Sequence, residues 1–174
     1  MIHMPMIRWV DKAFDFGFPV ETAPLLLERL RGTPARLDDR VRSLPRERLI
    51  QRDGAKWSIQ EHAGHFVDVE TLFSGRLDDY DAGAARLRPA AVSGQRTNAA
   101  DHNRRELSTI LAEFRVVRGN LVTRIEAMDE AGFARTAIHP RLDRPMRVCD
   151  MMLFEAEHDD HHLALITGLI RQWR

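Results

Sequence analysis

The sequence has little of what several classes of protein require. Its single cysteine, Cys149, cannot form an intramolecular disulfide, so nothing in the chain demands an oxidising compartment. Its 26 basic residues are balanced by 26 acidic ones, whereas a dedicated nucleic-acid surface needs a basic excess. No apolar run approaches the length of a membrane span. We therefore expect a protein that binds neither nucleic acid nor membrane.

The first residues also lack the basic start and apolar core of a signal peptide, and they carry Asp11 and Asp15 instead. Together with the lone cysteine, this predicts a cytoplasmic protein. The composition, 44% hydrophobic and 30% charged over 174 residues, is typical of one soluble globular domain. We expect that domain to cover residues 1–174, with residues 1–18 as an N-terminal extension.

Apolar residues recur at intervals of three and four along most of the chain, which is the spacing of one face of a helix. No stretch shows the sustained alternation and β-branched enrichment of a strand. We therefore predict an all-α fold, a four-helix bundle. Its helices are expected to span Val20–Arg42, Ser58–Tyr80, Thr97–Met128 and Val148–Trp173.

Proline and glycine mark the joints between these helices. The predicted loops are Ser43–Lys56, Asp81–Gly94 and His139–Pro145. The letters RGTP, Arg31–Pro34, predict a kink or restart within the first helix. Ser58 is a good N-cap for the second helix, and Glu61 three residues later completes a capping box.

The last helix carries a polar island inside its apolar face. Met151, Glu155, His158, His162 and Leu165 recur at three and four, so they share one face, and only the middle three are polar. His158 and His162 stand one turn apart, a spacing that lets two imidazoles bind one cation. Two histidines on a buried face need polar partners, and a cation would serve both.

Three neighbouring residues of that helix are less suited than His158 and His162 to bind the cation. His161 falls about 100° round the helix from His162, although it could form an i,i+3 pair with His158. Asp159 and Asp160 are expected to be solvated or to stand behind the ligands.

A third ligand should come from another helix, and the second helix offers His62 and His65. His62 lies nearer the centre of the apolar stripe, and His65 lies at its edge. Geometry alone slightly favours His62 for the interior, and a lone histidine there is more often a satisfied core residue than a ligand.

Two motifs in this order resemble the DinB-like family of metal-binding four-helix bundles. The first is KWSIQEHAGHFVDVE, in which a Trp-Ser pair opens a helix and is followed by Glu, then His, then Asp. The second is His-x-x-x-His in the last helix. The residues that carry the resemblance are Trp57, Ser58, Glu61, His65, Asp68, His158 and His162. The match extends over most of the chain, from about Leu30 onward.

The resemblance implies that His65, rather than His62, is the third metal ligand beside His158 and His162. It also implies an up-down-down-up bundle, a site at one end of the central cavity, and frequent homodimers. The expected cofactor is a divalent cation, zinc or nickel, with open positions filled by water.

Three neutral nitrogen ligands leave an open position, which is the pattern of a catalytic site rather than a closed structural one. The resemblance implies either a transferase that uses a low-molecular-weight thiol or a hydrolase, with a small-molecule substrate. The alternative is a binding or stress-response bundle that the metal stabilises without turnover.

Two acidic residues are candidates for roles at such a site. Asp68 is expected to orient an imidazole or to act in catalysis. Glu155, one turn before His158, is a candidate fourth ligand, general base or partner of a basic side chain. Cys149 is expected to be a small core residue. The third helix is crowded with arginines, most of them expected on a solvated face and one available to the cavity: Arg104, Arg105, Arg115, Arg118 and Arg124.

Overall fold

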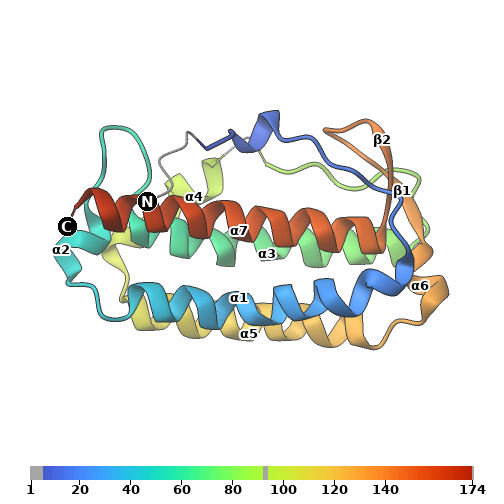
Figure 1. The fold of residues 1–174 in the computed structure, drawn as a ribbon, viewed down its shortest axis with the longest axis horizontal. Coiled ribbons are helices and arrows are strands. Elements are labelled where there is room, and N and C mark those ends of the chain that lie inside the picture. Colours follow the sequence, from blue (N-terminus) through green and yellow to red (C-terminus); the bar gives the residue numbers. More distant parts are fainter. Residues whose placement is uncertain (1–5, 92–93, 174) are drawn as a thin grey trace.

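Four long helices lie side by side in the computed structural model, which describes residues 6–91 and 94–173 (Figure 1). They are α1 (Ala23–Val41), α3 (Ile59–Asp81), α5 (Leu107–Glu126) and α7 (Val148–Gln172). The shorter elements are η1 (Trp9–Asp11), η2 (Val20–Thr22), α2 (Arg46–Ile50), α4 (Gln95–Ala99), η3 (His102–Arg104), α6 (Glu130–Ala134), β1 (Thr136–His139) and β2 (Arg144–Arg147). The four-helix bundle predicted from the sequence is confirmed.

The bundle has the up-down-down-up topology. Helix α1 packs against α5 and α7, and α3 packs against the same two helices, so α1 and α3 lie on a diagonal. Arg29 bonds Asp160 and, farther along both helices, Arg40 bonds Thr167, so α1 and α7 are parallel. Gln60 bonds Arg105 and, farther along both segments, Ser74 bonds Arg124, so α3 and α5 are parallel. Arg31 bonds Glu126, whereas Asp38, later in α1, bonds Arg115, earlier in α5, so α1 and α5 are antiparallel.

Helix α3 begins where its sequence predicts. The Ser58 hydroxyl accepts a hydrogen bond from the Glu61 backbone N–H at 3.1 Å, and the Glu61 carboxylate accepts one from the Ser58 N–H at 2.9 Å. This reciprocal capping box satisfies two N–H groups that the first turn of a helix leaves free. It fixes the register of the helix that carries His62 and His65.

Of the kink or restart expected at Arg31–Pro34, the restart is wrong, because α1 continues through Pro34. Proline has no N–H, so the carbonyl of Leu30 loses its partner within the helix. The guanidinium of Arg118 supplies the missing bond, since its Nη1 donates to the Leu30 oxygen at 3.1 Å. A buried arginine on α5 thus repairs the break in α1.

The prediction of a single helix over Thr97–Met128 is wrong in its first part, because the long helix begins only at Leu107. Asp101 has a φ of 48°, a left-handed conformation that a continuing helix does not allow, so the chain forms α4, then η3, then α5. This break turns the side chains of Thr97 and His102 toward α3, where both are buried.

A two-stranded antiparallel hairpin stands where the sequence predicts a loop at His139–Pro145. Strand β1 pairs with β2, with Ile138 opposite Pro145, and Asp143 at the turn has a φ of 49°. Each strand has four residues, and proline within the second removes the usual strand signal. Such short strands show no alternation that a sequence pattern can detect.

Residues 6–22, here called the N-terminal strap, lie along α7 and lead toward the hairpin (Figure 1). The guanidinium of Arg144 sits over the Phe16 ring at 4.5 Å, a cation–π contact that ties the strap to β2. At the other end of the strap the Trp9 ring meets the edge of His158 at 5.1 Å between centroids. The predicted N-terminal extension therefore covers part of α7.

The bundle interior has two apolar clusters with a polar layer between them. One cluster includes Leu30, Phe73, Leu77, Leu121 and Met152, and the other includes Leu37, Phe66, Phe114, Leu163 and Ile166. On every long helix, buried polar residues fall between the two sets: Thr33, Glu70, Arg118, His158, Asp159 and His162. His158 and His162 of α7 thus lie between the two apolar clusters. Within the described ranges, no helix is both long and apolar enough to cross a membrane.

Candidate metal centre

Three imidazoles from two antiparallel helices face one another in the polar layer. The Nε2 atom of His158 lies 3.2 Å from Nε2 of His65 and 3.1 Å from Nε2 of His162. One nitrogen from each of the three rings falls within 4.8 Å of the others. The structure therefore brings together the three histidines that the family resemblance implied as ligands, one from α3 and two from one turn of α7.

Burial keeps these rings neutral. It lowers the pKa of His65 to about 4 and holds the pKa of His158 and His162 well below the ordinary value of 6.5. Neutral imidazole is the form that binds a metal, because its unprotonated nitrogen has a free lone pair. Nitrogens that face one another at 3.1–3.2 Å without charge form a donor set that fits a divalent cation.

His65 is held from behind by a chain of hydrogen bonds. Its Nδ1 lies 2.9 Å from the Thr97 hydroxyl, which donates to the Asp68 carboxylate at 2.8 Å. Asp68 also receives a bond from Nε2 of His102 at 2.9 Å. Burial raises the pKa of Asp68, but the bonds from His102 and Thr97 outweigh burial and lower that pKa overall. The chain fixes the Nδ1–H tautomer of His65 and leaves its Nε2 lone pair facing inward.

His62 bonds the outer nitrogen of His162, as Thr97 bonds that of His65. Their Nδ1 atoms are 3.0 Å apart, so Nδ1–H of His162 donates to His62 when Nε2 of His162 faces the other rings. Burial lowers the pKa of His62 to about 4. His161 is outside the cluster: its half-buried ring packs against Trp9 at 5.8 Å between centroids. His62 and His161 therefore do not replace any of the three facing rings.

A buried ion cluster lies next to the histidines. The guanidinium of Arg118 bonds Glu70 at 2.9 Å and Asp159 at 2.6 Å, and it is 3.0 Å from Glu155. Asp159 also accepts a bond from the Thr33 hydroxyl at 2.7 Å. All four charged side chains are 1% exposed or less, so three carboxylates share one arginine.

Several residues whose roles were predicted from the sequence lie in this ion cluster. Asp159, expected to be solvated or behind the ligands, is fully buried and paired with Arg118. Glu155 stands beside the same arginine rather than among the facing nitrogens, and neither of its oxygens has a hydrogen-bond partner in the described structure. Burial raises the pKa of Glu155 well above its ordinary value, against the lowering effect of Arg118. Of the crowded arginines of the third helix, Arg118 is the one in the interior.

Comparison with known proteins gives a family. The family model of the DinB superfamily matches residues 29–166. The chain belongs to the DinB superfamily. Its resemblance to that family, read from the two histidine motifs, is confirmed.

One solved structure similar to this DinB-superfamily chain is that of YfiT from Bacillus subtilis. The TM-score is 0.79 at 20% sequence identity, and the match covers 93% of each chain. YfiT is described as a probable metal-dependent hydrolase with an unusual four-helix bundle topology. At this identity the likeness establishes the shared fold. Comparison with the curated proteins gives no match.

Thr97 and His102 are the neighbours of the site that the sequence did not reveal. Both lie in the segment that was expected to be part of one long helix, and both bond Asp68. His102 also packs so closely on Gly64 that a Cβ there would meet its ring at 2.2 Å. Asp68, expected to orient an imidazole, was the signal in the sequence that could have pointed to such partners.

Replacing Thr97 with valine is expected to weaken metal binding about 10–100-fold, the usual cost of losing a partner behind a metal ligand. Valine keeps the shape of threonine but cannot bridge His65 to Asp68. Competition with a chelating dye measures the affinity. Thr71→Val on the exposed side of α3 is the control. An affinity equal to that of the control would show that the bridge does not orient His65.

Proposed function

We propose that this protein is a divalent-metal-dependent enzyme whose cation is held by His65, His158 and His162. The observation that carries the proposal is the approach of their three Nε2 atoms between the two apolar clusters, with His158 and His162 buried and His65 partly buried. Imidazole ligands suit zinc and nickel, which are the cations we propose. The bonds behind His65 and His162 support it, because they set the tautomers that metal ligation requires.

Hydrolysis is the reaction class that we propose first. A cation held by three neutral ligands supplies Lewis acidity and lowers the pKa of a bound water. The chain's own contribution is to hold the rings in place through Thr97 and His62 and to exclude water with the surrounding apolar clusters. The description of YfiT, a DinB-like neighbour, supports this choice.

Metal analysis of protein purified without added metal tests the proposal. We expect about one zinc or nickel per chain, turnover of a chromogenic ester or amide, loss of turnover on chelation, and recovery when the metal is restored. A protein that binds no metal, or whose turnover survives chelation, would contradict the proposal. If chelation unfolds the bundle and no substrate turns over, the non-catalytic, metal-stabilised alternative is correct.

Transfer of a low-molecular-weight thiol is the second candidate, supported by the resemblance of the two histidine motifs. Cys149 does not provide the sulfur, because it is fully buried in an apolar cluster and burial raises its pKa. A thiol would come from outside and be kept deprotonated by the metal. Incubation with glutathione, bacillithiol or mycothiol and a general electrophile separates the candidates: metal-dependent adducts favour transfer, and their absence favours hydrolysis.

The same family resemblance leads us to propose a homodimer. Sedimentation of the purified protein at several concentrations measures its mass in solution. A mass equal to that of one chain throughout would exclude this assembly.

A further inference from the structure

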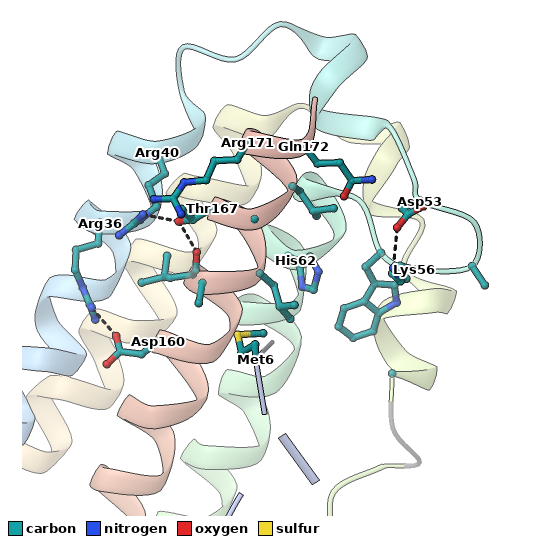
Figure 2. Close-up of a pocket in the computed structure, with 18 of the residues that line it drawn as sticks. Met6, Arg36, Arg40, Asp53, Lys56, His62, Asp160, Thr167, Arg171 and Gln172 are labelled. Carbon is teal, nitrogen blue, oxygen red and sulfur yellow. Dashed lines mark hydrogen bonds and ion pairs between the residues drawn. The ribbon is translucent and has the colours of Figure 1, made fainter. Parts of the chain in front are cut away.

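A cavity of about 1170 Å³ opens beside the histidine cluster (Figure 2). Its walls come from α1, from α7, and from the loop that leads into α3. This volume exceeds the roughly 300–1,000 Å³ typical of ligand pockets, so a small organic molecule would fit within it. Part of the wall is apolar, formed by Trp57, Leu163, Ala164 and Leu169. The cavity therefore offers a surface for an apolar body as well as for polar groups.

Two of its wall residues connect the cavity to the histidines. His62 lines it and is bonded to His162 through their Nδ1 atoms at 3.0 Å. The Trp57 ring is 4.8 Å from the His65 ring between centroids, and its indole N–H donates to Asn98 at 2.7 Å, which holds the ring in place. A molecule in the cavity would lie one side chain away from the proposed metal ligands.

The charges in the cavity do not cancel. Arg36 is neutralised by Asp160 at 2.6 Å, and Lys56 is neutralised by Asp53 at 2.7 Å (Figure 2). Among the residues that the structure describes, these two pairs use both acidic side chains that line the cavity. The remaining charged wall residues are cationic, in a chain whose formal net charge is zero.

The remaining cations are Arg40 and Arg171, and both line the cavity. Nη1 of Arg40 donates to the Thr167 hydroxyl at 2.6 Å, and Arg171 follows Thr167 by one helical turn on the same face (Figure 2). Neither arginine has a carboxylate within ion-pair distance in the part of the chain that the structure describes. Two guanidinium groups without carboxylate partners in one cavity favour an anion there, because each can donate charge-assisted hydrogen bonds to it.

We propose that this cavity binds the anionic end of a small organic substrate, a carboxylate or phosphate on an apolar body, with Arg40 and Arg171 as its recognition residues. The proposal rests on the proposed function for its reaction site, since the bound molecule would extend from the arginines past His62 toward the histidine cluster. Recognition of the anion itself depends only on the two arginines.

Calorimetric titration with phenyl phosphate and with phenylacetate tests this inference, and benzyl alcohol serves as the uncharged counterpart. We expect saturable binding of at least one anion and none of the alcohol. Arg40→Gln and Arg171→Gln should each weaken that binding about tenfold or more, because each loses a charge-assisted hydrogen bond. Arg42→Gln, directly after the end of α1, exposed like Arg40 and Arg171 but outside the cavity, should bind like the unaltered protein. The two anions distinguish a phosphate from a carboxylate substrate.

Each titration is run on protein as purified and after chelation, with circular dichroism to confirm that every variant is folded. Binding that persists after chelation and falls in the two arginine variants supports the inference even if the protein proves to hold no metal. Three results would overturn it: neither anion binds, the two variants match Arg42→Gln, or chelation abolishes binding.

Discussion

His162→Gln is expected to weaken zinc binding by more than about 100-fold, the upper end of what the loss of an outer partner costs. The change removes one of three facing Nε2 atoms and leaves Nδ1 of His62 without its bond. Glutamine keeps a polar side chain of similar reach, so the bundle should still fold. Calorimetric titration of the metal-free protein with zinc measures the affinity.

His161→Gln provides the matched control, because it changes the neighbouring histidine of the same helix. That ring faces Trp9 and lies outside the cluster of facing nitrogens. Its replacement should change zinc affinity less than about threefold, within the spread of ordinary surface changes. Equal losses in the two variants would mean that the three facing imidazoles are not the binding site.

Arg118→Met is expected to lower the free energy of unfolding by about 3–5 kcal/mol, the cost of leaving buried charges without their partner. For a chain of this size, that corresponds to a fall in melting temperature of roughly 6–20 °C. Methionine fills a similar volume, but it neutralises none of the carboxylates of Glu70, Glu155 and Asp159 and leaves the Leu30 carbonyl unbonded. Thermal and urea unfolding measure the loss.

The deficit should grow as pH rises. Without the guanidinium, the carboxyls of Glu70 and Glu155 bind protons more tightly in the folded state than in the unfolded one, because burial already raises the pKa of both. Stability is then retained at low pH and lost as pH rises above the ordinary value of about 4.5. Arg115→Met, which removes an exposed ion pair on the same helix, should cost less than about 1 kcal/mol at any pH. Matching losses in the two variants would contradict this account.

The long helices were predictable because each buries one apolar stripe, and the stripe repeats with the period of the helix. The largest error at α1 is at its start, Val20 in the prediction against Ala23 in the structure. The helix through Pro34 was not predictable from α1 alone, because the group that satisfies the Leu30 carbonyl comes from Arg118 on a distant helix.

The candidate site was predictable in part. The spacing of His158 and His162 placed them on one face of α7, but local geometry slightly favoured His62 over His65. The structure gives both a place: His65 faces the other two rings, and His62 stands behind His162. The apolar stripe of α3 alone cannot distinguish the roles of His62 and His65, because the distinction depends on how α3 is rotated relative to α7.

Asp159 illustrates a second limit. A charged residue next to a histidine pair has no pattern that predicts full burial, since acids are seldom buried unless they are paired. Its partners are Arg118 on α5 and Thr33 on α1, each far away in the sequence. One arginine among several on the third helix therefore had to be found from tertiary contacts.

All the polar groups of α7 that matter for this layer fall within two turns of one unbroken helix, from Glu155 to His162. Inserting or deleting one residue in that stretch would turn everything beyond it by about 100°. Either the ion cluster or the histidine pair would then point into the apolar clusters. Length changes during the divergence of this chain should accordingly accumulate in its loops, while the spacing between Glu155 and His162 stays fixed.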